Sequence, residues 1–144
     1  MRAFPSINAL IAKWRREGVE LNPPADAAAI DRVEREIGVA LPDSLRAFCA
    51  RANGMVDPEM DGGGTACWSV DKVVSEHEVW RGSDARGAFT DWAIADLMIR
   101  AHYFSLRLRE DAPPTFMVDG FGLEFASFEA MAAAYLADPQ QFGA

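Results

Sequence analysis

The sequence predicts an α+β fold, with helices first, a mainly antiparallel sheet in the middle and a covering helix at the end. Apolar residues recur at helical spacing through positions 4–52. Residues 103–109 instead alternate apolar and polar side chains, as a half-buried strand does, and a helical pattern returns at 127–137. The 144 residues, half of them hydrophobic, suit one core, so we expect one domain over 1–144.

Two amphipathic helices are predicted at the start. The first places its apolar stripe within residues 4–14, with Ser6 as N-cap and Gly18 where the helix stops. The second is capped by Asp26 and ends at Gly38, a residue that tolerates the left-handed conformation of a helix C-terminus.

A third helix is predicted after Pro42, which suits the first turn of a helix. It is expected to end in a left-handed cap at Asn53-Gly54. A glycine-rich loop then leads to a strand over 66–70, centred on Trp68, and Asp71 caps the short helix that follows.

The remaining strands are predicted in the second half. Residues 89–101 fit neither the helical nor the strand period of apolar residues. We interpret them as two strands with a break near Asp96, followed by the clear strand at 103–109. Segments 115–118 and 123–125 flank Asp119-Gly120, a hairpin turn signal. Ser127 then caps the last helix.

Charge is distributed unevenly in this chain of net charge -8. Residues 55–98 hold nine acidic and three basic side chains. Such a field repels nucleic acid and anionic membranes and speeds encounter with a basic protein, although charge kept for solubility alone stays the alternative. No apolar run reaches membrane-span length, and the chain shows no export signal, so we expect a cytoplasmic protein without nucleic-acid or membrane partners.

Residues suited to catalysis are few. Cys49 lies on an apolar helix face, Cys67 lies beside a tryptophan, and His77 and His102 stand apart in the sequence. The cysteines are expected to be buried thiols, and the four residues lack the close-paired spacing of a zinc site. We therefore expect no catalytic residues, metal or cofactor.

A partial calcium-loop pattern occurs at 57–62. Asp57, Glu59 and Asp61 take loop positions 1, 3 and 5, and glycine takes position 6. Position 12, which should be a bidentate Glu, is Trp68. A calcium module or a small enzyme is therefore only the third alternative.

The run AAIDRVEREIGVALPDSLRAFCARANG at 28–54 resembles the opening signature of the SUKH superfamily. In that signature a helix ending in Gly leads to Leu-Pro, a helix with a central Phe and a closing Asn-Gly. With the later tryptophan strand, the resemblance covers roughly residues 25–137. The matching positions, which we interpret as structural, are Gly38, Leu41, Pro42, Phe48, Asn53, Gly54 and Trp68.

The resemblance implies a non-catalytic protein-binding domain. Bacterial members are mostly immunity proteins that bind and block a toxin domain, often a nuclease, and a fungal relative is a cell-wall synthesis regulator that acts as an interaction hub. We therefore expect an immunity protein that neutralises a basic toxin domain through an acidic surface; the alternative is an intracellular regulatory scaffold of the same fold. The candidate contacts are Asp57, Glu59, Asp61, Glu76, Glu78, Trp80, Asp84 and Asp91.

Overall fold

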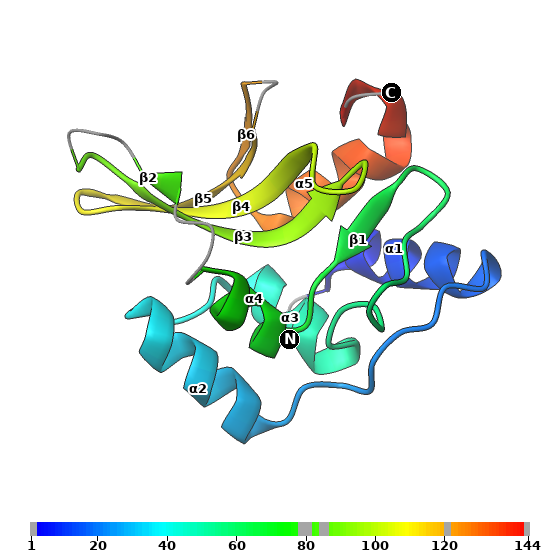
Figure 1. Cartoon of the computed structure of the whole chain (residues 1–144), viewed down its shortest axis with the longest axis horizontal. Helices are drawn as coiled ribbons and strands as arrows, with labels where there is room; N and C mark the ends of the chain where they lie inside the picture. The colour runs from blue at the N-terminus through cyan, green and yellow to red at the C-terminus, as the bar shows by residue number, and fades with distance from the viewer. Residues whose placement is uncertain (1–2, 78–81, 84–86, 120–121, 143–144) are drawn as a thin grey trace.

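The protein forms an antiparallel sheet covered by helices, as Figure 1 shows for its computed structural model. The structure describes residues 3–77, 82–83, 87–119 and 122–142. The predicted α+β class is confirmed. The helices are α1 (Pro5–Arg16), α2 (Ala27–Ile37), α3 (Asp43–Arg51), α4 (Val70–His77), α5 (Phe128–Ala137) and a 3-10 turn, η1 (Pro139–Phe142). The strands are β1 (Thr65–Cys67), β2 (Gly82–Ser83), β3 (Thr90–Leu97), β4 (His102–Arg109), β5 (Ala112–Val118) and β6 (Leu123–Phe125).

The sheet follows the order β1-β3-β4-β5-β6. Both β1 and the short β2 pair with the edge of β3 that faces away from β4. In Figure 1 the sheet runs across the upper half of the view, and α2, α3 and α4 lie beneath it. The predicted strand at 103–109 is confirmed within β4, and the hairpin of β5 and β6 is confirmed as a strand pair. Gly120 of its predicted turn lies outside the described residues.

A connected series of aromatic rings joins the helices to the sheet. Trp14 on α1 meets Phe48 on α3 edge to face, with ring centroids 6.0 Å apart. Phe48 lies 5.0 Å from Phe128 on α5, which in turn lies 5.8 Å from Phe116 on β5. All four side chains are buried, so the core lies between α1, α3, α5 and the inner face of the sheet.

The first helix begins differently from the sequence prediction. Ser6 does not cap α1, because Pro5 starts the helix and Phe4 takes the N-cap position. The carboxylate of Glu129, in the first turn of α5, instead accepts hydrogen bonds from the backbone N–H groups of Ser6 and Ile7 at 2.8 and 2.9 Å. A residue more than 120 positions away thus satisfies donors that a local cap would otherwise take.

The cap predicted for α2 is confirmed. The Asp26 side chain accepts a hydrogen bond from the Ala29 N–H at 2.8 Å, and Gly38 ends the helix at a φ of 90°. The end predicted for α3 is wrong, because Ala52 leaves the helix in an extended conformation. The Asn53 side chain instead accepts a hydrogen bond from the Val70 N–H at the start of α4, at 2.9 Å.

Gly54 has a packing reason rather than a capping one. Its φ is 70°, and a Cβ at this position would lie 2.4 Å from the carbonyl carbon of Trp68. Two backbone segments therefore cross here at a distance that only glycine permits. The strand predicted over 66–70 is shorter than expected, because β1 ends at Cys67 and Trp68 follows it. Ser69, not Asp71, caps α4 by accepting a hydrogen bond from the Lys72 N–H.

The predicted break near Asp96 is wrong, because β3 runs without interruption to Leu97. Its pairing with β4 shifts between Ala93 and Ala95, which indicates a bulge at Ile94. The extra residue disturbs the two-residue alternation and explains why the sequence fits no single period. The chain turns instead at Met98–Arg100.

Candidate functional site

The structure separates the eight candidate contacts into three groups. Glu78, Trp80 and Asp84 lie outside the described residues. Asp61 and Asp91 are buried, while Asp57, Glu59 and Glu76 reach the surface. The structure therefore does not gather the described carboxylates into one acidic patch.

Asp61 points into the protein, which corrects its assignment as a surface contact. It is 5% exposed, and its carboxylate accepts hydrogen bonds from the Trp14 indole N–H at 2.9 Å and from the Tyr135 hydroxyl at 2.7 Å. The backbone N–H groups of Gly63 and Thr65 also donate to it, at 2.9 and 3.0 Å. Asp61 thus connects α1, α5 and the start of β1.

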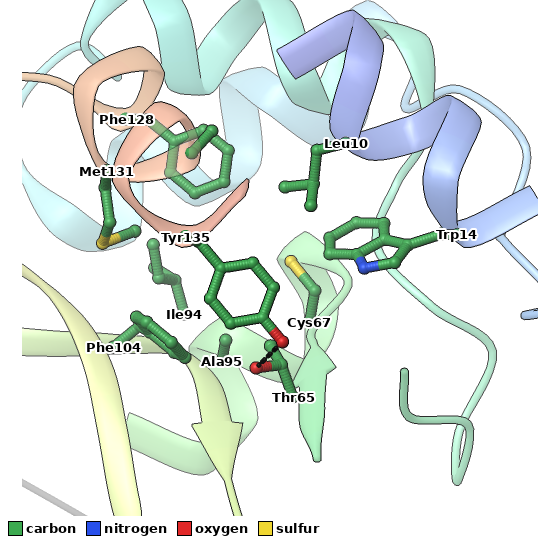
Figure 2. Close-up of a pocket in the computed structure, with 11 residues that line it drawn as sticks. Leu10, Trp14, Thr65, Cys67, Ile94, Ala95, Phe104, Phe128, Met131 and Tyr135 are labelled. Carbon is green, nitrogen blue, oxygen red and sulfur yellow. Dashed lines mark hydrogen bonds between the residues drawn. The ribbon is translucent and has the colours of Figure 1, made fainter. Parts of the chain in front are cut away.

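Figure 2 shows a pocket lined by Trp14, Thr65 and Tyr135, in which Tyr135 from α5 is directed at Thr65 and the Trp14 side chain extends from α1. Thr65 donates a 3.0 Å hydrogen bond to the Tyr135 hydroxyl, and burial raises the pKa of Tyr135 well above its ordinary value. The void between these side chains measures about 30 Å³ and has an almost entirely apolar lining. A space of this size could hold only a single water molecule, and its apolar lining would offer that water few hydrogen-bond partners. We therefore interpret the space as a packing defect of the core.

Asp91 is buried on the outer face of the sheet, which likewise corrects its assignment as a surface contact. Arg107, its partner across the β3–β4 pair, holds both carboxylate oxygens at 2.7 and 2.8 Å. The Arg107 guanidinium also lies 3.5 Å from the centroid of the Phe89 ring. The Asp91 charge is thus matched within the sheet, so its removal, rather than its presence, is what should change the stability of the fold.

Two cations lie near the Trp68 ring and each binds a carboxylate; we call Asp57, Lys72, Glu76, Arg100 and Trp68 the Trp68 cluster. Lys72 binds Asp57 at 2.8 Å, and Arg100 binds Glu76 through two contacts of 2.8 and 3.0 Å. The Lys72 ammonium and the Arg100 guanidinium lie 5.4 and 5.6 Å from the indole ring, within the range of cation–π attraction. The loop after α3, helix α4 and the β3–β4 turn therefore meet at this indole.

The electrostatics of the cluster follow from these pairs. The hydrogen bond from Lys72 lowers the pKa of Asp57, and the hydrogen bonds from Arg100 lower the pKa of Glu76. Both carboxylates stay ionised at neutral pH, and the four charges balance. Asp57 nevertheless keeps 72% of its side chain exposed, so it has room for a second cation. Asp71, on the same helix, is 66% exposed and binds Arg32.

The turn at Met98–Arg100 was not predicted. Its three residues have φ values of 56°, 53° and 64°, whereas every other positive φ among the described residues belongs to a glycine. The left-handed conformation costs a non-glycine residue about 1–2 kcal/mol, and β-branched Ile99 is especially unsuited to it. The sequence Met-Ile-Arg contains no glycine or asparagine, so nothing in it indicates such a turn.

The calcium-loop pattern does not form a site. Asp57 binds Lys72, Glu59 accepts a hydrogen bond from the Glu20 N–H at 2.8 Å, and Asp61 turns inward. The three carboxylates thus take different directions, and within the described part of the chain no three His, Cys, Asp or Glu residues could together hold a metal ion.

The two thiols are poorly suited to nucleophilic chemistry. Both are buried, and burial raises the pKa of Cys49 to about 12 and that of Cys67 further still. A nucleophilic cysteine is a thiolate of lowered pKa, the opposite of what these surroundings produce. His77 stacks on Trp92 with ring centroids 3.4 Å apart, and His102 lies 3.4 Å from Asp119.

Within the described ranges, every helix falls short of the length and hydrophobicity needed to cross a membrane. No curated protein gives a significant match to the chain. Residues 24–131 match the SMI1/KNR4 family (SUKH-1), and they include the signature helices α2 and α3, the Trp68 cluster and the whole sheet. The chain therefore belongs to the SMI1/KNR4 family (SUKH-1), within the superfamily that its sequence resembles.

Proposed function

We propose that this protein is a cytoplasmic bacterial immunity protein, which binds a basic toxin domain and blocks its activity. The observation that carries this proposal is membership of the SUKH-1 family, which is consistent with an immunity-type protein-binding domain. The interior supports a binding role rather than catalysis, because the buried thiols are held in their unreactive protonated form.

The binding face that we propose consists of the four charged residues of the Trp68 cluster together with Asp71, while Trp68 itself is buried. Of the sequence-predicted contacts it keeps Asp57 and Glu76, and Asp71 is added because it is exposed on the same helix. Surface carboxylates held by a single cation can accept an arginine or lysine from a partner without a large desolvation cost. Glu78, Trp80 and Asp84 follow α4 in the sequence and stay predicted contacts.

The test uses a charge reversal at this face and a matched reversal elsewhere. Asp57→Lys with Asp71→Lys changes two exposed carboxylates of the proposed face. Glu110→Lys with Asp111→Lys makes the same charge change in the exposed β4–β5 turn. Each tagged protein is used to purify partners from the source cells at low and then high salt. The partner that the wild type retains is then titrated against each variant. Cells that express each variant are scored for protection against that partner.

The face variant is expected to bind the partner about tenfold more weakly at low salt and to lose protection, while the turn variant behaves as wild type. The difference should shrink at high salt, because salt screens exposed charges. Equal protection by both variants would contradict the proposed face. Recovery of several housekeeping proteins and no toxin would contradict the immunity function and favour a regulatory scaffold.

A further inference from the structure

The turn Met98–Arg100 presents apolar side chains to solvent. Ile99 is 78% exposed and Met98 is 49% exposed, which makes Ile99 the most exposed large hydrophobic residue in the described part of the chain. Neither side chain contributes much to the core, and a glycine or asparagine would suit the left-handed backbone better. The fold alone therefore gives no reason for an isoleucine here.

The turn is held firmly in place. Asp96 accepts hydrogen bonds from the Arg100 backbone N–H at 3.2 Å and from the Trp68 indole at 2.8 Å. The Met98 N–H donates to the Gly64 carbonyl at 2.9 Å. The Arg100 side chain is fixed by Glu76 and by the Trp68 ring. Ile99 is thus displayed on a rigid support, which lowers the ordering cost of binding.

The net charge of the whole chain and the exposed carboxylate of Asp57 indicate what would cover the turn, although Arg100 in the turn is itself a cation paired with Glu76. A second copy is disfavoured, because each chain carries a net charge of -8 and two copies repel each other. Asp57, in the same cluster as Arg100, leaves 72% of its side chain open to a cation. The complementary surface is therefore an apolar pocket with lysine or arginine at its rim.

We propose that Ile99 and Met98 form the apolar anchor of the toxin interface and insert into such a pocket of the basic toxin domain. This inference rests on the proposed function and deepens it, because it names the residues whose burial supplies the affinity. The charged Trp68 cluster would then surround the anchor, in the way that polar rims surround binding hot spots.

The test is the substitution Ile99→Asn, with Val39→Asn as the matched control at another exposed apolar residue, 41% exposed. The probe is the basic partner that the wild type retains in the purification described above, and its binding is measured by calorimetry at low and high salt. Ile99→Asn is expected to keep or raise the melting temperature, because asparagine tolerates the left-handed turn. Its affinity should fall about 10- to 100-fold, equally at both salt concentrations.

Any of the following three results would overturn the inference. If the toxin domain binds the wild type and Ile99→Asn equally, the anchor is wrong while the immunity function stands. If the purification recovers no basic toxin domain, the proposed function fails and the anchor fails with it. If sedimentation shows a dimer of the wild type that Ile99→Asn abolishes, the occupant of the anchor is a second copy.

Discussion

Replacing Asp61 by alanine should destabilise the protein strongly, although this residue belongs to an acidic loop that looks like surface in the sequence. The substitution removes the acceptor for the Trp14 indole, the Tyr135 hydroxyl and the Thr65 N–H, all buried donors. A buried donor left without a partner costs about 1–3 kcal/mol, and some of these groups can recover water. We therefore expect a loss of about 3–5 kcal/mol, a large part of the 5–15 kcal/mol typical of a domain.

Urea unfolding followed by circular dichroism measures this loss, and a chain of this size should melt about 10–15 °C lower. Asp57→Ala is the matched control, because it removes an exposed carboxylate from the same loop and should cost less than about 1 kcal/mol. A double-mutant cycle with Trp14→Phe should show coupling between the indole and the carboxylate. If the free energy of unfolding of Asp61→Ala lies within 1 kcal/mol of the wild-type value, the carboxylate does not hold the helices together and our assignment is refuted.

Three further predictions concern the buried groups. Asp91→Asn should lower the free energy of unfolding by about 2–4 kcal/mol, because it removes the buried negative charge that holds Arg107 through two hydrogen bonds, and chemical denaturation would show this. Gly54→Ala should lower the free energy of unfolding by about 3 kcal/mol or prevent folding. Gly18→Ala, with open space around its Cβ, should lower it by only about 1–2 kcal/mol. Similar melting temperatures for the two variants would contradict the backbone crossing at Gly54. Both thiols should resist a thiol reagent at pH 8 in the folded protein and react once urea is added. Because burial raises their folded-state pKa above the ordinary thiol value of 9.0, the free energy of unfolding should fall as the pH rises through and above 9, and a flat profile would contradict this.

Local signals in the sequence explain which parts of the fold were predicted. Asp26 and Ser127 cap their helices through the N–H three residues ahead, so the whole interaction lies within one turn. Ser6 carries the same signal but lies inside the helix, because Pro5 starts it, and Glu129 from a distant part of the sequence accepts the Ser6 N–H. The bulge at Ile94 depends on pairing with β4, so no pattern within β3 alone could predict it.

The candidate site was harder to predict for a similar reason. The sequence composition does not distinguish one carboxylate from another, whereas the fold buries some carboxylates and exposes others. Asp61 is buried because Trp14 and Tyr135, at distant positions in the sequence, supply its donors. Asp57 stays exposed only four residues earlier. The family signature was the more reliable guide, because it includes the helix end at Gly38 and core residues such as Phe48, which the apolar pattern alone places in the interior.

The hydrogen bonds from the first helix to Glu129 affect the order in which the molecule can be made. During synthesis α1 leaves the ribosome first, yet the carboxylate that receives its amino-terminal N–H groups emerges more than 120 residues later. Helix α1 also packs on α5, so its apolar face lacks its native cover until the last helix appears. A nascent chain stalled before residue 129 should therefore leave α1 open to proteases and chaperones, and the fold should complete only after α5 has emerged.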